Sequence, residues 1–157
     1  MMRYASNTNV SEGRSRAEIE RLLMRYGAEE FGYVTRSGEA MIGFVYRELR
    51  VQMAMPLPSR SEKRFTHTPG RGGLRTPDAA ITEWQKEVRR RWRSLCLVVK
   101  ALLVGIDDGV LTFEQAFMPW VVWGNGLTTS QMILPHIKEA IDGGHMPKDL
   151  KQLELLP

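Results

Sequence analysis

Residues 31–55 read FGYVTRSGEAMIGFVYRELRVQMAM, and this stretch decides the fold. Its apolar and polar side chains alternate with a period of two, as in strands that bury one face. Tight turns are predicted at Ser37-Gly38 and at Arg47-Glu48, and two-residue loops at both positions fix how the strands pair. The predicted pairs are Phe31 with Phe44, Tyr33 with Ile42, Phe44 with Val51, Ile42 with Met53, and Tyr46 with Leu49.

These large side chains all fall on one face, so the sequence predicts a three-stranded antiparallel meander with one apolar side. The other face carries mainly polar residues and glycines, with Val34, Met41 and Val45 as its apolar minority. Pro56 and Pro58 end the third strand, because proline lacks the N–H that a sheet interior needs.

A short helix is predicted before the meander. Ser15 and Glu18 are spaced as a capping box, apolar residues follow at intervals of three and four, and Gly27 provides a C-terminal stop. Residues 1–14 are polar and show no periodicity, so we expect a flexible arm there.

The longest predicted helix follows the meander and should lie across its apolar face. Thr76-Pro77-Asp78 combines a capping hydroxyl, a proline at the first helical position and an acid near the positive end of the helix dipole. Asp107-Asp108-Gly109 ends the helix. Its apolar stripe consists of Ile81, Trp84, Val88, Trp92, Leu95, Val99, Leu102 and Ile106.

The remainder of the chain is predicted to be a small helical segment, which makes the fold class α+β and residues 15–157 a single domain. The expected elements are a helix over 113–117 capped by Thr112 and Gln115, an extended stretch over 119–123, a turn at Asn125-Gly126, a helix from Thr128 to about Ile141 that Pro135 kinks or splits, and a coil over 142–157.

Composition points to one ordinary soluble domain. The chain has 157 residues, of which 43% are hydrophobic and 25% are charged. The first ten residues lack the apolar core of a signal peptide, and the longest apolar stretch, 95–104, is too short to span a membrane. We therefore expect a cytoplasmic protein with no membrane partner. The single Cys96 excludes an internal disulfide, and its apolar neighbours predict a buried thiol.

A search for catalytic or metal-binding patterns finds none that is complete. His67, His136 and His145 have no His or Cys four residues away, so no standard zinc spacing exists. The glycine-rich stretch 70–73 lacks the Gly-Lys-Ser/Thr ending of a phosphate loop, and no serine stands in a nucleophile elbow. We expect a protein that is not an enzyme and uses no cofactor and no metal.

Positive charge is concentrated in one segment. Residues 59–93 contain ten basic and four acidic side chains, a net charge of +6, whereas the whole chain has +4 and the remainder therefore −2. Residues 59–76 are predicted to be a long basic loop that leads into the basic half of the long helix, a combination suited to gripping phosphates. The candidate nucleic-acid-binding residues are Arg71, Arg75, Lys86, Arg89, Arg90 and Arg93, with Phe65 as a base-stacking group and His67 beside it.

Two resemblances add expectations. The stretches 15–23, 65–71 and 91–95 resemble a family of small uncharacterised proteins encoded by bacteriophages and prophages, which implies an accessory protein in the cytoplasm of a bacterial host and brings no catalytic residues. The order helix, meander, basic helix is similar to the double-stranded-RNA-binding fold. That family's basic helix start is absent here, and the long loop and the C-terminal segment are additional.

Two functions therefore stay open. The first is an accessory protein that binds the phosphate backbone of DNA or RNA without catalysis, although a basic helix face can also be merely solvated. The second is a protein-binding inhibitor or adaptor of a host or phage enzyme. Its surface would be Val34, Met41 and Val45, which could equally form a homodimer, together with the segment 120–123.

Overall fold

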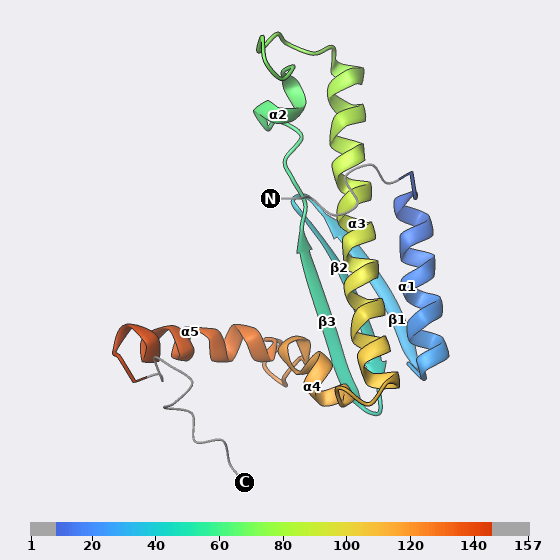
Figure 1. The fold of residues 1–157 in the computed structure, drawn as a ribbon, viewed down its shortest axis with the longest axis vertical. Helices are drawn as coiled ribbons and strands as arrows, with labels where there is room; N and C mark the ends of the chain where they lie inside the picture. Colours follow the sequence, from blue (N-terminus) through green and yellow to red (C-terminus); the bar gives the residue numbers. More distant parts are fainter. Residues whose placement is uncertain (1–8, 146–157) are drawn as a thin grey trace.

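The computed structural model describes residues 9–145, and its elements follow the predicted order (Figure 1). The parts of the predicted arm at 1–8 and of the predicted coil at 146–157 lie outside the described residues. The elements are α1 (Glu12–Tyr26), β1 (Glu30–Arg36), β2 (Glu39–Tyr46), β3 (Leu49–Pro56), α2 (Lys63–Thr66), α3 (Pro77–Asp107), α4 (Phe113–Phe117), the 3-10 helix η1 (Met118–Trp120) and α5 (Thr129–Asp142).

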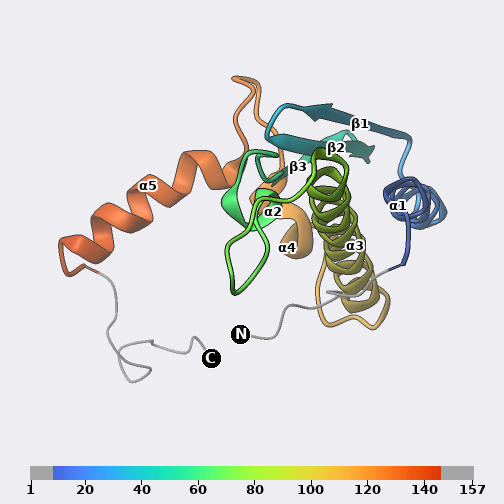
Figure 2. The ribbon, with the colours of Figure 1, turned by 90° about the horizontal axis from the view of Figure 1, so that it is seen from above.

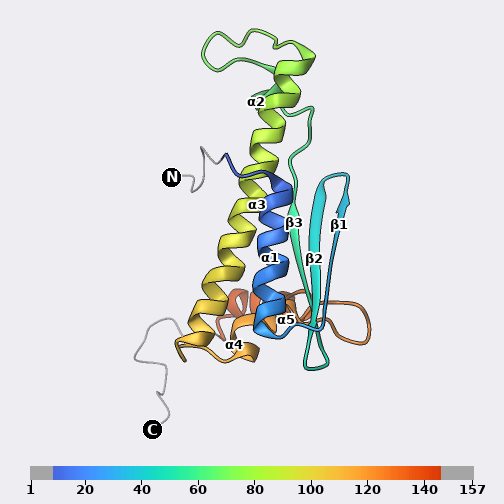
Figure 3. The same ribbon diagram turned by 90° about the vertical axis from the view of Figure 1, so that its right-hand side faces the viewer.

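The sheet has the order β1-β2-β3, and every predicted cross-strand pair is confirmed. Ile42 and Val51 are fully buried on the inner face, which α1 and α3 both cover, and no helix of residues 9–145 lies over the other face (Figures 2 and 3). Arg47 and Glu48 have φ of 45° and 68°, the left-handed pair of a tight hairpin turn. Alternation and turn geometry therefore specify one register.

The first helix begins earlier than predicted. Ser11, not Ser15, is the N-cap, and its hydroxyl accepts the Arg14 N–H at 3.2 Å. Ser15 lies one turn inside the helix, where its hydroxyl is fully buried and has no hydrogen-bond partner among residues 9–145. The predicted capping box is wrong because Ser15 faces the core. The predicted stop at Gly27 is confirmed, since its φ of 106° is a left-handed C-cap.

The long helix α3 starts with Thr76 as its N-cap and ends at Asp107, as predicted. Its contact with the core is centred on Trp92, which is fully buried. Val99, about two turns further along the helix, is also fully buried. Ile81, predicted to join this stripe, is 40% exposed. The first turns of α3, to which Ile81 belongs, extend beyond the end of the sheet (Figure 3).

The predicted loop over 59–76 is largely ordered structure. It contains the one-turn helix α2 and a tight hairpin in which His67 pairs with Leu74 and the Thr68 N–H donates to the Gly73 carbonyl at 2.8 Å. The long basic loop predicted over 59–76 therefore contains local structure, and α2 packs beside α3 (Figure 1).

The C-terminal part agrees with the prediction except at two places. The stretch 119–123 begins as η1, and only then does Val121 pair with Val51 at the open edge of β3. The capping residues Thr112 and Thr128 and the turn at Asn125-Gly126 are confirmed.

The last helix, α5, is not split at Pro135, so of the two predicted effects, a kink or a split, the split is wrong. It continues through Pro135 and projects away from the sheet (Figures 1 and 2). None of its residues is buried, and Ile133, Leu134 and Ile141 are about half exposed. Among the described residues, no helix combines the length and hydrophobicity needed to cross a membrane.

The turn between β2 and β3 provides a test of this fold. Glu48 adopts a left-handed conformation that glycine adopts without steric cost, so Glu48→Gly should stabilise the protein by about 1 kcal/mol. Urea unfolding followed by circular dichroism measures the change. Glu39→Gly, placed in an ordinary strand conformation, should instead destabilise by a similar amount. Equal effects of the two variants would contradict the described turn.

Candidate nucleic-acid interface

The basic segment forms an overhang at one end of the molecule. The overhang consists of α2, the hairpin over 67–74 and the first turns of α3, all of which extend past the ends of the strands (Figures 1 and 3). Residues 59–93, whose net charge is +6, form this overhang and the turns of α3 that follow it, so the chain's excess positive charge lies on and beside the overhang.

Arg75 is part of the framework of the overhang. Its Nη1 donates to the carbonyl oxygens of Arg64, Phe65 and His67, at 3.0 Å for the first two. These carbonyls belong to α2 and the residue after it, so the guanidinium satisfies acceptors that a helix end leaves free. The prediction of Arg75 as a free phosphate-binding group does not fit this arrangement.

The two aromatic candidates of the segment also have structural environments. Phe65 is 4% exposed, so its ring cannot stack on a base as the sequence suggested. His67 is partly buried, and its Nδ1 lies 2.8 Å from the Thr66 hydroxyl. That contact is the local hydrogen bond of a loop histidine, and no carboxylate or second histidine of the described residues pairs with it.

A buried carboxylate, Glu87, gathers three arginines. It accepts two hydrogen bonds from Arg90, at 2.6 and 2.8 Å, and one from Arg91 at 3.3 Å, while an Arg64 nitrogen lies 3.8 Å away. The hydrogen bonds and charge of Arg90, helped by the hydrogen bond from Arg91 and the charge of Arg64, outweigh burial and lower the pKa of Glu87 to about 2. Arg90 is therefore committed to this cluster, whose net charge remains positive.

Arg93 and Lys86 are paired as well. Arg93 donates to Glu18 of α1 at 2.6 Å and so joins the two helices, and this hydrogen bond lowers the pKa of Glu18. Lys86 pairs with Glu83 at 2.6 Å on the exposed side of α3.

Next to Arg93, Cys96 is fully buried as predicted, and burial raises the pKa of its thiol to about 11.

Several basic side chains on or beside the overhang form no ion pair with a carboxylate of the described residues. Of the predicted candidates, Arg71 at the hairpin tip, Arg75 and Arg89 on α3 are in this state, and Arg75 is held by backbone carbonyls instead. The structure adds Arg36 at the end of β1, Arg60 and Lys63. These side chains can bind an external anion without first breaking an internal pair.

Three of these arginines line a groove below the overhang. One hollow of about 550 Å³ lies between the β1–β2 turn, residues 57–60 and Trp84, and it includes Arg36. A second hollow of about 410 Å³ shares Arg60 and Trp84 with the first and reaches Arg89 and the start of α1. We call this pair of hollows the arginine groove.

The arginine groove contains one carboxylate among its lining residues, that of Glu12. Glu12 already pairs with Arg16 at 3.5 Å, so it leaves the three groove arginines uncompensated. The Arg60 guanidinium lies 4.3 Å from the centre of the Trp84 ring, and the Trp84 N–H donates to the Pro58 carbonyl at 2.8 Å. The indole is thereby held in one orientation under a cation.

Sequence reasoning missed the arginine groove for a definite reason. Arg36, Arg60 and Arg89 come from a strand end, a connection and a helix, and only the packing of α3 over the sheet brings them together. Trp84 was assigned to the core stripe, yet it is only partly buried. The one available signal was that Arg60 follows Pro58 by only two residues, which places it close to the end of the third strand.

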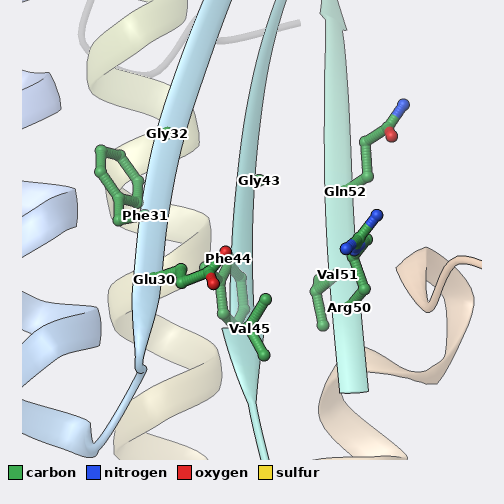
Figure 4. Close-up of a pocket in the computed structure, with 9 residues that line it drawn as sticks. All are labelled: Glu30, Phe31, Gly32, Gly43, Phe44, Val45, Arg50, Val51 and Gln52. Atoms are coloured by element: carbon green, nitrogen blue, oxygen red, sulfur yellow. The ribbon is translucent and has the colours of Figure 1, made fainter. Parts of the chain in front are cut away.

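The outer face of the sheet carries a separate, shallow hollow of about 250 Å³ (Figure 4). It lies over the paired glycines Gly32 and Gly43, with Glu30 and Arg50 beside it. The predicted apolar minority is on this face: Val34 is 44% exposed, and Met41 and Val45 are partly buried.

Comparison with known proteins supplies no relative: no protein-family model, no curated protein and no solved structure matches the chain. The resemblances to phage-encoded proteins and to the double-stranded-RNA-binding fold therefore stay predictions. Within residues 9–145, no group of three or more His, Cys, Asp or Glu side chains is arranged to hold a metal ion.

The Glu87 cluster predicts a specific pH dependence. A carboxyl whose pKa falls from 4.5 to about 2 on folding stabilises the protein fully above pH 5, and this stabilisation is lost as the pH falls toward 2. Glu87→Gln should therefore destabilise the protein more at pH 7 than at pH 3, by a difference of about 2 kcal/mol. Urea unfolding at both pH values measures it. Equal destabilisation by Glu87→Gln at pH 7 and at pH 3 would contradict the described pairing of Glu87 with the arginines.

Proposed function

We propose that the protein binds nucleic acid without catalysing a reaction, by contacting phosphates with the basic end of the molecule. The observation that carries this proposal is the arginine groove, where Arg36, Arg60 and Arg89 converge without a carboxylate partner. Positive charges that lie close together repel one another, and a bound anion relieves this repulsion. Guanidinium groups suit phosphate because they donate two parallel hydrogen bonds.

The proposal divides the basic residues into two groups. Arg75, Arg90 and Arg93 maintain the structure, because each is held by carbonyls or by a carboxylate. Arg71 and Lys63 are exposed on the overhang and extend the positive field around the groove. Long-range attraction then comes from the whole segment, and close contacts come from the unpaired side chains.

A phage-type accessory role in the cytoplasm of a bacterial host is the setting that we propose for this activity. It is supported by the resemblance of the stretches 15–23, 65–71 and 91–95 to small phage proteins. The single buried thiol of Cys96 is compatible with a reducing compartment.

A fluorescence-anisotropy titration with labelled DNA tests the proposal. The double variant Arg60→Gln/Arg89→Gln should weaken binding about tenfold or more, since two charged contacts to phosphate are lost. Arg21→Gln/Arg25→Gln, which removes the same charge from the exposed side of α1, should change the affinity much less. Undetectable binding of the unmodified protein at low salt would refute the proposal.

A protein-binding adaptor or inhibitor is the second candidate, and the exposed apolar stripe of α5 favours it. Ile133, Leu134, Ile137 and Ile141 repeat along one side of this projecting helix, and each is between 38% and 59% exposed. No described residue buries them. A stripe of this kind on a helix is the usual form of a helix-in-groove contact.

The α5 stripe can be tested apart from the groove. Ile133→Asp/Ile137→Asp should abolish the binding of a protein partner, or self-association seen by light scattering, while it changes the free energy of unfolding by less than about 0.5 kcal/mol. Val34→Asp/Met41→Asp is the matched variant on the outer sheet face. If only the sheet variant loses association, the interface lies on the outer face of the sheet and not on α5.

A further inference from the structure

The arginine groove has a chemistry beyond phosphate attraction, because a tryptophan stands between its cations. We infer that the groove takes a short single-stranded segment of nucleic acid, with a base stacked on the Trp84–Arg60 pair and phosphates on Arg36 and Arg89. This inference rests on the proposed function and specifies its ligand.

The first argument is the position of Trp84. It lines both hollows of the groove, and the Arg60 guanidinium covers part of its ring at 4.3 Å. Bases of unpaired strands stack both on indole rings and on guanidinium planes. The hydrogen bond from the Trp84 N–H to the Pro58 carbonyl holds the indole ring in place before a ligand binds. Binding therefore costs little side-chain conformational entropy at Trp84.

The second argument is the spacing of charge along the groove. Arg36 lies at the end near the β1–β2 turn, Arg60 lies at the shared wall, and Arg89 lies at the end near α1. Cations on both sides of a stacking platform match a backbone that runs past it, since each nucleotide carries one phosphate. Each hollow has the volume of a small-molecule site, which is the scale of a single nucleotide.

The third argument is that a duplex cannot use this site fully. Its bases are paired and stacked inside the helix, so none can reach Trp84 unless it is first flipped out. The other aromatic candidate of the basic segment, Phe65, is 4% exposed and offers no second platform. A duplex would contact only the outer cations and would gain no stacking.

The experiment compares ligands and variants on the full chain. Anisotropy titrations use a labelled single strand of about eight nucleotides, as DNA and as RNA, and a duplex DNA of about twelve base pairs, which is long enough to stay paired. The single strands should bind about tenfold more tightly than the duplex, the effect of one stacked base. Their log affinity should fall with log salt with a slope of about −1.4, as expected for the two phosphate contacts of Arg36 and Arg89.

Variants locate the site. Arg36→Gln should weaken single-strand binding and make the salt slope shallower by about 0.7, whereas Arg21→Gln removes the same charge elsewhere and should leave the slope unchanged. Trp84→Leu should weaken binding about tenfold, and Trp84→Phe should retain most of it because a ring remains. Circular dichroism verifies that each variant is folded.

Each outcome is decisive. Tighter binding of the DNA or the RNA single strand with these variant effects supports the inference, and the ratio of the two affinities shows which sugar is preferred. Duplex binding that equals or exceeds single-strand binding overturns the inference and leaves the proposed function standing. An Arg36→Gln effect no larger than that of Arg21→Gln also overturns the inference. No binding of any nucleic acid at low salt refutes both.

Discussion

The rest of the structure depends on a difference in length between α3 and the sheet that it covers. Thirty-one helical residues extend about 46 Å, whereas strands of eight residues extend about 26 Å. Packing centred on the fully buried Trp92 holds α3 on the inner face, so its first turns must project past the strands. The overhang, the position of α2 and the arginine groove all follow from that projection.

The overhang has little hydrophobic core of its own, and polar contacts stabilise it instead. Arg75 holds the carbonyls of α2, Glu87 gathers arginines from two helices, and the Arg91 guanidinium donates to the Pro56 carbonyl at 2.6 Å. Several of the basic side chains in residues 59–93 are therefore engaged in internal hydrogen bonds and ion pairs. Ion pairs with low exposure, such as Arg90 with Glu87, contribute more than the exposed pair of Lys86 and Glu83.

Much of the fold could be predicted from sequence, because its determinants are local. The register follows from two-residue turns and alternation, and Thr76, Thr112 and Thr128 each cap a helix through contacts within three residues. The start of α1 was mispredicted because Ser11 and Ser15 carry the same capping chemistry. Only the tertiary contact that buries Ser15 distinguishes them.

The candidate site was harder to predict, because which arginine is free depends on contacts across the fold. Arg93 is paired by Glu18, a residue 75 positions away, whereas Arg89, one turn earlier on α3, has no such partner. The sequence located the charge in the correct segment. It could not separate the arginines that stabilise the overhang from those that face the arginine groove.

The most direct measurement is a nuclear magnetic resonance titration of the labelled protein with a short single-stranded oligonucleotide, following arginine Nε–H and tryptophan indole N–H signals. The account predicts the largest shifts at Arg36, Arg60, Arg89 and Trp84, with small shifts at Arg90 and Arg93, which stay in their ion pairs. Shifts concentrated on Arg90 and Arg93 would place binding away from the arginine groove and contradict this assignment.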